Sequence, residues 1–282
     1  MSSDIKTSTI SIATWNVNSI RARLASVSQW LSSTSPDIIL LQETKCMDEQ
    51  FPISEINHMG YNVDMVGQKS YNGVAILSKR QISTELKQLP LYDSNIEDLE
   101  ARYIEAVISF GSSVVRVASV YVPNGSSTLK HGEKLEESKR FRYKISFLQR
   151  LAKRVQEVLQ FDNEYIVFGG DYNVALQEID LYNPKSSADD VGFHKEEIKN
   201  LKKILNLGLQ DTYRFLYPDK IAYSWWDYRR GRWPDDKGWR IDYLLSSKHT
   251  LEDTADCLIH KDVRGHEKAS DHVPVEIKIK IS

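Results

Sequence analysis

The sequence contains few cysteines and no long apolar run. Cys46 and Cys257 are its only cysteines among 282 residues, too few for a disulfide framework, and this scarcity favours a reducing compartment. No apolar run approaches the roughly 18 residues of a membrane span, and residues 1–9 lack the apolar core of a signal peptide. We therefore expect a soluble intracellular protein that does not act at a membrane. It would lie in the cytoplasm or nucleoid of a prokaryote, or in the nucleus of a eukaryote.

The sequence also lacks a strong net charge and a glycine-rich phosphate loop. Its formal charge is −2, so bulk charge predicts no nucleic-acid partner and a local basic patch would be needed. Without a glycine-rich loop ending in Lys-Ser or Lys-Thr, nucleotide triphosphate hydrolysis of that kind is unsupported. The chain is 41% hydrophobic, which is enough for a large core. No linker or repeat divides it, so we expect a single catalytic domain over residues 10–282 behind a polar tail at residues 1–9.

The hydrophobic pattern predicts an α/β protein. Apolar residues recur at helical spacing in residues 20–31, 141–158 and 198–205. Short alternating or continuous apolar runs predict strands at residues 10–15, 37–42, 61–66, 73–77, 102–110, 114–122, 165–168, 239–245 and 273–281. The predicted strands fall into two groups along the chain, and each group has helices around its middle or end. This order predicts a two-layered β core flanked by helices.

One predicted strand leads directly into polar residues. An apolar run at residues 166–168 is expected to break at two glycines, which allow close backbone approach and tight turning, and Asp171 and Asn173 follow. Ligands of α/β proteins gather just beyond the carboxyl ends of strands. An acid and an amide at that point indicate a polar site on a rigid base. The alternative is an Asx-type turn in which both side chains bond only their own backbone.

Other predicted strands end in the same way, at Asn16 and Asn18, at Glu43, and at Tyr121. The two asparagines could instead cap the helix that follows them. Glu43 could be a solvated residue paired with Lys45, and Tyr121 could be an ordinary strand aromatic. Each alternative remains open for the residue taken alone.

The carboxyl-terminal third combines aromatic, basic and acidic residues. Trp225 and its aromatic neighbours are followed at once by Arg229 and Arg230, a pattern that suits phosphate contacts with base or sugar stacking. It also suits an aromatic core beside a solvated basic loop. Asp242 interrupts an apolar strand pattern, and a buried acid needs a partner. Asp271 and His272 precede the last strand, where a lone histidine could equally be an exposed loop residue.

If these strand ends converge, they form a site with several carboxylates, three amides, a phenol and one imidazole. Carboxylate oxygens suit Mg²⁺, with Mn²⁺ also compatible, better than zinc. Chemistry on phosphate esters needs a cation to offset charge, a base to activate water and donors to the phosphate oxygens. Glu43 would hold the metal. His272, oriented by Asp242, would act as a base or bind phosphate as an imidazolium.

The motifs that carry these residues resemble the exonuclease III family of apurinic/apyrimidinic (AP) endonucleases. That family belongs to a wider group of metal-dependent phosphodiesterases. The resemblance covers residues 10–279 and rests on the order and spacing of Thr14-Trp-Asn-Val-Asn18, Pro36-Asp-Ile-Ile-Leu-Leu-Gln-Glu-Thr-Lys45, Tyr121-Val-Pro-Asn124, Gly170-Asp-Tyr-Asn173, Asn183-Pro-Lys185, Tyr223-Ser-Trp-Trp226, Trp239-Arg-Ile-Asp-Tyr243 and Ser270-Asp-His272. It implies a four-layered α/β sandwich of two stacked mixed β-sheets flanked by helices.

The resemblance also implies a role for each site residue. The metal would be held by Glu43, with Asp271 and Asn18 beside it. The catalytic group would be Asp171, His272, Asp242, Tyr121 and Asn173. The substrate would be bound by Asn16 (through Asp171), Trp225, Trp239, Ile241, Arg229 and Arg230. Asn18 departs from relatives that have an aspartate there, which weakens the case for a second metal.

The implied function is a Mg²⁺-dependent DNA-repair phosphodiesterase that cuts the backbone 5′ to abasic sites. We also expect removal of blocked 3′ ends and 3′–5′ exonuclease activity on duplex DNA, by a monomer. Two alternatives are a phosphodiesterase of lipid or inositol phosphates and a catalytically weak DNA-binding relative. The division of general-base duty between Asp171 and His272 stays open at this stage.

Overall fold

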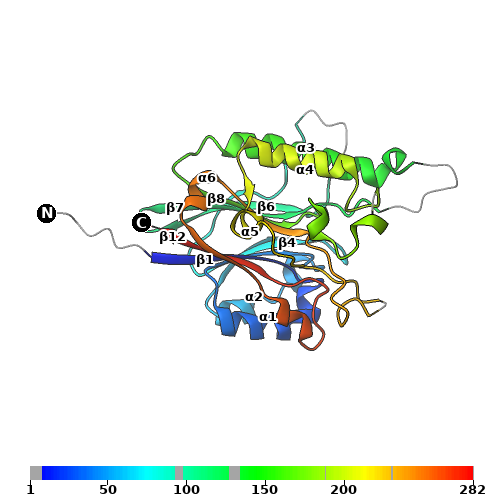
Figure 1. The fold of residues 1–282 in the computed structure, drawn as a ribbon. Helices are drawn as coiled ribbons and strands as arrows, with labels where there is room; N and C mark the ends of the chain where they lie inside the picture. Colours follow the sequence, from blue (N-terminus) through cyan, green and yellow to red (C-terminus); the bar gives the residue numbers. More distant parts are fainter. Residues whose placement is uncertain (1–7, 93–97, 127–133, 188, 230, 282) are drawn as a thin grey trace.

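The structure is a computed structural model that describes residues 8–92, 98–126, 134–187, 189–229 and 231–281 (Figure 1). Two six-stranded sheets stack on one another. The first contains, in spatial order, β11 (Thr254–Ile259), β12 (Val275–Ile281), β1 (Ser8–Asn16), β2 (Ile38–Gln42), β4 (Val74–Ser78) and β3 (Asn62–Val66). The second contains β5 (Ser83–Leu86), β6 (Tyr103–Phe110), β7 (Ser113–Tyr121), β8 (Tyr165–Asp171), β10 (Asp242–Ser246) and β9 (Gln210–Asp211).

Helices cover the outer faces of both sheets (Figure 1). The first sheet is covered by α1 (Ile20–Thr34) and α2 (Ile53–His58), and the second by α3 (Lys139–Val158) and α4 (Lys195–Leu207). Shorter elements are α5 (Thr212–Leu216), α6 (Lys248–Glu252) and the 3₁₀ turns η1 (Asp48–Gln50), η2 (Leu135–Glu137), η3 (Glu178–Asp180), η4 (Pro184–Ser186) and η5 (Lys261–Gly265). The predicted four-layered α/β sandwich with two stacked mixed sheets is confirmed.

The strand β2 shows why a central strand reads as a continuous apolar run. Side chains alternate between the two faces of a strand. Ile38 and Leu40 belong to the core between the sheets, whereas Ile39 and Leu41 pack with α1. Because both faces are buried, the four positions from Ile38 to Leu41 are all apolar. The apolar residues therefore end only where the strand reaches the edge of the sandwich, and Glu43 follows there.

The two glycines of β8 allow the predicted close backbone approach but make no tight turn. They do not break the strand, which continues through them to Asp171. A Cβ atom on Gly169 would lie 2.6 Å from Leu40 of the facing sheet, and one on Gly170 would lie 1.8 Å from the carbonyl oxygen of Val120 on β7. The glycines thus permit close packing directly behind Asp171.

Several boundaries differ from the predictions. The first strand begins at Ser8, within the predicted polar tail. The last strand of the second sheet begins at Asp242 and not at Trp239, so Asp242 opens a strand and does not interrupt one. Of the two expected caps of α1, Asn18 and Ser19, it is Ser19 that caps the helix through its hydroxyl. The short strands β5, β9 and β11 were not predicted because they lack a sustained apolar alternation.

None of the helices in the described residues is long and apolar enough to cross a bilayer.

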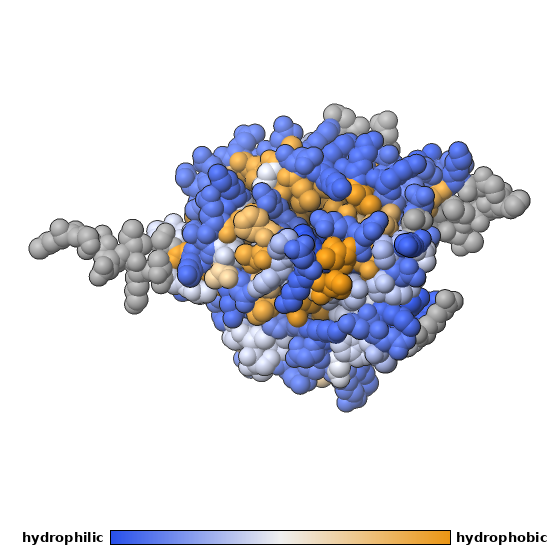
Figure 2. Space-filling view, viewed as in Figure 1, coloured by the Kyte–Doolittle hydropathy of each residue, from blue (hydrophilic) through white to orange (hydrophobic). Residues whose placement is uncertain are grey.

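The face in Figure 2 is mainly hydrophilic, and apolar side chains gather near its centre, over α5. There, Leu216 and Tyr217 pack against the core between the sheets. This patch is therefore the exposed edge of that core. Both cysteines are buried, in agreement with a structural role.

Candidate active site

The ends of five strands meet at one edge of the sandwich. The carboxyl ends of β1 and β2 are paired in parallel, as are those of β7 and β8, and β10 begins beside the end of β8. A cavity of about 330 Å³ opens at this edge. It is lined by Glu43, Tyr121, Asn124, Ser126, Asp171, Asn173, Val191, Gly192, Trp225, Trp239, Ile241, Asp271 and His272. The structure thus brings nine of the predicted site residues to one cavity.

His272 is held by Asp242 at the back of the cavity. Its Nδ1 lies 2.9 and 3.1 Å from the two carboxylate oxygens of Asp242. A carboxylate only accepts hydrogen bonds, so Nδ1 carries the proton and donates. The Ser224 hydroxyl donates to Asp242 at 2.6 Å and fixes the orientation of the acid. The imidazole therefore presents its Nε2 to the cavity, as the predicted acid–imidazole pair requires. The histidine is buried, not an exposed loop residue.

Asp171 faces His272 across this part of the site. Its Oδ2 lies 3.7 Å from Nε2 of His272 and accepts a hydrogen bond of 2.9 Å from Nδ2 of Asn16. Its Oδ1 accepts from the backbone N–H of Asn173 at 2.9 Å. This is the Asx-type turn that the sequence left as an alternative, and the same residue also lines the cavity. The turn and the site are therefore compatible.

Burial and neighbouring charges shift the pKa values of this pair. Burial raises the pKa of Asp171 to about 7, opposed by His272 and Asn16 and reinforced by Asp242 and Glu43. Burial alone would lower the pKa of His272, but Asp242 and Asp171 outweigh it and raise that pKa to about 10. At neutral pH the imidazole is therefore an imidazolium beside a carboxyl group poised to exchange a proton.

Glu43 connects the two sheets at the mouth of the cavity. Its Oε1 accepts hydrogen bonds of 2.8 Å from Nδ2 of Asn16 and from the Tyr121 hydroxyl. Its Oε2 forms an ion pair of 2.5 Å with Lys45, the partner that the sequence left as an alternative. Burial raises the pKa of Glu43, but Lys45, Asn16 and His272 together outweigh it and leave that pKa below its ordinary value. The carboxylate is therefore ionised.

Oxygen atoms of Glu43 and Asn18 bind the ammonium group of Lys45. Nζ of Lys45 lies 2.5 Å from Oε2 of Glu43 and 2.6 Å from the amide oxygen of Asn18. Nδ2 of Asn18 donates in turn to Asp271 at 2.9 Å. Burial raises the pKa of Asp271, but His272, Trp225 and Asn18 outweigh it and lower the pKa. Two ionised carboxylates and an amide oxygen are the donor set of a hard divalent ion, so these residues fit Mg²⁺.

A second acidic group is a poorer metal site. Asp171, Asp242 and His272 place ligand atoms within 4.8 Å of one another. However, Nδ1 of His272 carries the proton bonded to Asp242, and the raised pKa keeps the ring cationic near neutral pH. In that state Nε2, the ring nitrogen that faces the cavity, is protonated as well, and a metal ion would have to displace a proton to bind the ring. Glu43 and Asp271 are therefore the better candidates for holding the ion.

Asn173 and Tyr121 make internal hydrogen bonds in this structure. Nδ2 of Asn173 donates to the carbonyl of Val122 at 2.9 Å and to Asp171 at 3.3 Å. The hydroxyl of Tyr121 has one proton and donates it to Glu43. The predicted bonds to phosphate would therefore have to replace the longer Asn173 bond and the Tyr121 bond.

Aromatic and apolar side chains wall one side of the cavity. Trp225 and Trp239 pack edge to face with ring centroids 6.0 Å apart, and Ile241 lies beside them. Nε1 of Trp225 donates to Asp271 at 3.0 Å. Arg229 lies apart from the cavity lining, with its side chain 88% exposed. Arg230, the other predicted DNA-probing residue, lies outside the described residues.

Some contributors were not predicted. Ser224 orients Asp242, and the Ser-Trp-Trp motif that contains it was the one available signal. Val191 and Gly192 line the cavity, yet they lie in a loop without strand or helix periodicity. Asn124, by contrast, belongs to the Tyr121-Val-Pro-Asn124 motif already identified in the sequence; it lines the cavity and donates to the side chain of Asn173 at 3.2 Å.

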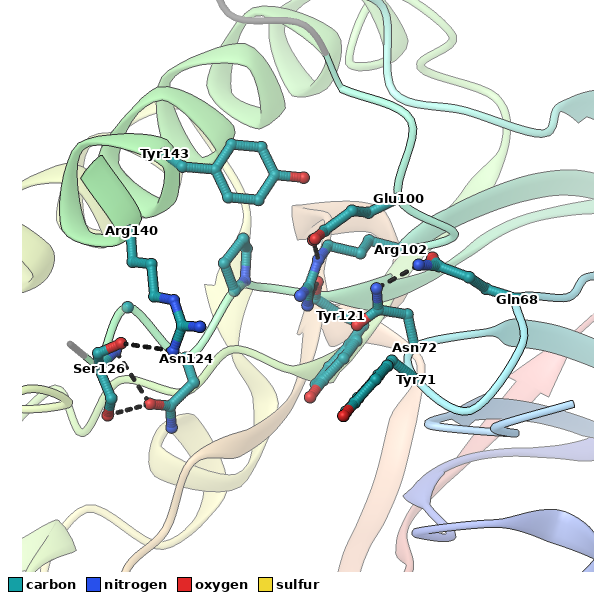
Figure 3. Close-up of a pocket in the computed structure, with 12 residues that line it drawn as sticks. Gln68, Tyr71, Asn72, Glu100, Arg102, Tyr121, Asn124, Ser126, Arg140 and Tyr143 are labelled. Atoms are coloured by element: carbon teal, nitrogen blue, oxygen red, sulfur yellow. Dashed lines mark hydrogen bonds and ion pairs between the residues drawn. The ribbon is translucent and has the colours of Figure 1, made fainter. Parts of the chain in front are cut away.

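A second cavity of about 410 Å³ adjoins the first through Tyr121, Asn124 and Ser126 (Figure 3). Arg102 forms an ion pair with Glu100 there, and its guanidinium lies 4.6 Å from the centre of the Tyr121 ring. Arg140 on α3 borders the same cavity. The second cavity thus places aromatic and basic side chains beside the first.

Comparison with known proteins covers almost the whole chain. The model of the Endonuclease/Exonuclease/phosphatase family matches residues 13–272. An exodeoxyribonuclease of Bacillus subtilis is 36% identical over 276 residues, covering 96% of this chain and 99% of its own. The solved structure of an AP endonuclease from Archaeoglobus fulgidus has a TM-score of 0.83 and 35% identity, covering 95% of this chain and 98% of the other. A 3′ phosphatase from Neisseria bound to a product DNA hairpin has a TM-score of 0.87 and 32% identity, covering 96% and 99%.

Proposed function

Because the chain belongs to the endonuclease/exonuclease/phosphatase family, on its exonuclease III and AP endonuclease side, we propose that it cuts the DNA backbone 5′ to abasic sites in a Mg²⁺-dependent reaction. The coarser activity, phosphodiester hydrolysis by a DNA-repair nuclease, follows from this membership. The observation that carries the finer proposal is the cavity itself. Asp171, His272 and the ionised Glu43 line the same cavity. Trp225 and Trp239 form one of its sides.

In the proposed reaction, a water oxygen bonds to phosphorus and the bond to the upstream 3′ oxygen breaks. That oxygen takes a proton and becomes a 3′-hydroxyl. Mg²⁺, held by Glu43 with Asp271 and Asn18, would supply positive charge at the phosphate. Asp171 would orient the water and exchange a proton at Oδ2. The imidazolium of His272, held by Asp242, would stabilise the negative charge that grows on the phosphate oxygens.

The remaining residues would bind and orient the substrate. Asn173 and Tyr121 would exchange internal hydrogen bonds for bonds to the phosphate, and Asn16 would keep Asp171 in place. Trp225, Trp239 and Ile241 would enclose the baseless sugar after it leaves the helix. We further propose that a terminal 3′ phosphate or nucleotide can occupy the same place, which would give 3′-repair and 3′–5′ exonuclease activities.

We propose that double-stranded DNA, bound by a monomer, extends beyond the first cavity on both sides. The second cavity offers Arg140 as a cation and Tyr71, 70% exposed, as an aromatic face. Arg229 and Arg230 would contact the backbone or the gap left by the extruded sugar. Such contacts release counterions, so binding should weaken steeply as salt is added.

One assay tests the proposed function. A duplex with a single abasic-site analogue is incubated with the protein and Mg²⁺, Mn²⁺ or EDTA. We expect a nick 5′ to the analogue that leaves a 3′ end extendable by a polymerase, with either metal and not with EDTA. Absence of a metal-dependent nick would contradict the proposal. Faster turnover of sphingomyelin or an inositol phosphate than of DNA would favour a lipid or inositol phosphate substrate.

Replacing Trp225 with alanine should harm abasic cleavage more than simple phosphodiester hydrolysis. The indole walls the cavity, and loss of one wall should misplace the sugar and lower kcat/KM for the abasic duplex by about 10- to 100-fold. Trp225→Phe keeps a ring but removes the Nε1 donor to Asp271. Kinetics of both variants on the abasic duplex and on a small phosphodiester separate these roles. Equal losses on both substrates in Trp225→Ala would refute the pocket role.

A further inference from the structure

Lys144 is a fully buried lysine directly behind the cavity. It lies on α3 with a relative exposure of 0%. Its Nζ is 2.5 Å from Oε1 of Glu197 on α4, which is equally buried. A buried charge is costly unless it is paired and hydrogen-bonded, and removing one partner leaves the other uncompensated. The pair could serve only to join the two helices, so its other contacts decide what else it does.

The other contacts of Lys144 lead to residues of the cavity. Nζ donates to the backbone carbonyl of Asn173 at 2.7 Å and to that of Asn124 at 3.1 Å. Nζ thus makes two hydrogen bonds to backbone carbonyls in addition to its ion pair with Glu197. The side chains of Asn124 and Asn173 are also bonded to one another. One cation therefore fixes the backbone on two sides of the cavity.

Glu197 extends this connection to a third segment. Its Oε2 accepts from the backbone N–H groups of Gly192 at 2.8 Å and His194 at 3.0 Å. Gly192 lines the cavity, and its carbonyl accepts from the N–H of Ala175 at 2.7 Å. The Lys144–Glu197 pair thus joins three loops that surround the cavity, which come from different parts of the chain.

The backbone at these loops requires such support. Asn173 has φ 51°, in the left-handed region, which asparagine adopts more readily than most non-glycine residues but still at a cost in free energy. Strained conformations of this kind persist only where the surroundings hold them. Gly125 lies against the stem of Lys144, where a Cβ atom would be 2.9 Å from Cδ of the lysine. The loop at Asn124 is therefore packed directly onto the lysine stem.

We propose that Lys144, paired with Glu197, is a positioning residue for the nuclease reaction, holding Asn173 and the loops at Asn124 and Gly192 in the geometry that the reaction needs. The inference rests on the proposed function. Lys144 touches no substrate and acts through the carbonyls of Asn173 and Asn124. Because Asp171 accepts from the N–H of Asn173, movement of this turn would also displace the carboxylate.

The kinetic test uses variants that separate positioning from stability. Lys144→Met should lower kcat on the abasic duplex by about 10- to 100-fold and change KM less than threefold, because a small misplacement affects the reacting geometry more than duplex binding. Lys144→Met/Glu197→Gln removes both charges. It should recover thermal stability relative to Lys144→Met while kcat stays low, because the carbonyls remain unheld.

A matched control removes a buried cation elsewhere. Arg116, in the first half of β7, pairs with the buried Glu105 of β6, and neither residue lines the cavity. Arg116→Met should lower the unfolding temperature and keep kcat within about twofold of the wild type. The proposal is overturned if Lys144→Met keeps wild-type kcat, if the double variant regains it, or if Arg116→Met loses it equally. If Lys144→Met does not fold, the double variant and Glu197→Gln take its place. Glu197→Gln keeps the lysine but weakens its ion pair, and a wild-type kcat in both of these variants would overturn the proposal.

Hydrogen exchange gives a readout that does not depend on the reaction. In the double variant, backbone amides around residues 173–175 and 192–194 should exchange at least tenfold faster than in the wild type, while amides of β6 are unchanged. Unchanged exchange in those segments would overturn the proposal whatever the activity. Failure of the wild-type protein to nick abasic DNA would instead overturn the proposed function, since it needs no variant.

Discussion

Replacing Asp171 with asparagine should lower kcat for nicking of the abasic duplex by about 10²- to 10⁴-fold, the usual contribution of a positioned acid or base. Asparagine has nearly the same shape but cannot take or give the proton. It also has only one acceptor oxygen, whereas Asp171 accepts from Asn16 at Oδ2 and from the backbone of Asn173 at Oδ1. Single-turnover kinetics would measure the chemical step directly.

The same substitution should not destabilise the protein at about pH 8. The pKa of Asp171 is raised to about 7, so the folded state favours the neutral carboxyl. That contribution to stability is present below the ordinary pKa of an aspartate and is lost as pH rises through about 7. Above this range a neutral side chain avoids the cost, and we expect an unfolding temperature equal to or above that of the wild type.

A buried acid with the opposite environment provides the control. Glu105 is bonded to Arg116 and Arg154, and its pKa is lowered because these partners and Tyr103 outweigh the effect of burial. Glu105→Gln should therefore reduce stability at about pH 8 and keep kcat. If Asp171→Asn kept kcat within tenfold of the wild type, or unfolded several degrees earlier, the proposed role of Asp171 would be wrong.

The sequence predicted which polar residues lie at the ends of strands, because an apolar run ends where its strand reaches the edge of the sheet. Residues 38–41 are apolar on both faces since β2 is buried between α1 and the second sheet. The side chains that follow such a run must lie at the edge, and this placed Glu43 and Asp171 correctly. What periodicity could not predict is that these edges coincide. Asp242 pairs with Asp171 across β10 and β8. Asn16 donates hydrogen bonds to Glu43 and Asp171, and both sets of contacts join elements far apart in the chain.

Residues that act from behind the site were the hardest to predict. Lys144 and Glu197 lie on amphipathic helices, where lysine and glutamate ordinarily face solvent. Nothing in the spacing distinguishes these two buried charges from the exposed ones around them. Gly192 contributes backbone only, so its side-chain chemistry gave no signal. The resemblance to a known family arranged the motifs correctly, but it assigned no role to these three residues.

Replacing Asp242 with asparagine should reveal whether His272 acts as a cation or as a base, a choice that the sequence left open. After the opposing effect of burial, Asp242 makes the largest contribution to the raised pKa of His272. Since that pKa is raised to about 10, the charged ring persists below it and is lost as pH rises through it. If the imidazolium is the active form, the wild-type rate should fall only toward that pH, and Asp242→Asn should move the fall to lower pH.

The two roles predict opposite profiles of kcat against pH. For the cation, Asp242→Asn loses more activity at about pH 9 than at about pH 7, in addition to an overall loss of about 10²- to 10⁴-fold from the disturbed imidazole. For a neutral base, the wild-type rate rises toward pH 10, and the lowered pKa shifts that rise toward neutral pH. Ser224→Ala, which removes the hydroxyl bonded to Asp242, should produce a smaller shift in the same direction. A wild-type rate that climbs up to pH 10 would exclude the imidazolium role, because the charged fraction of the ring falls as pH approaches its pKa while the rate would still be rising.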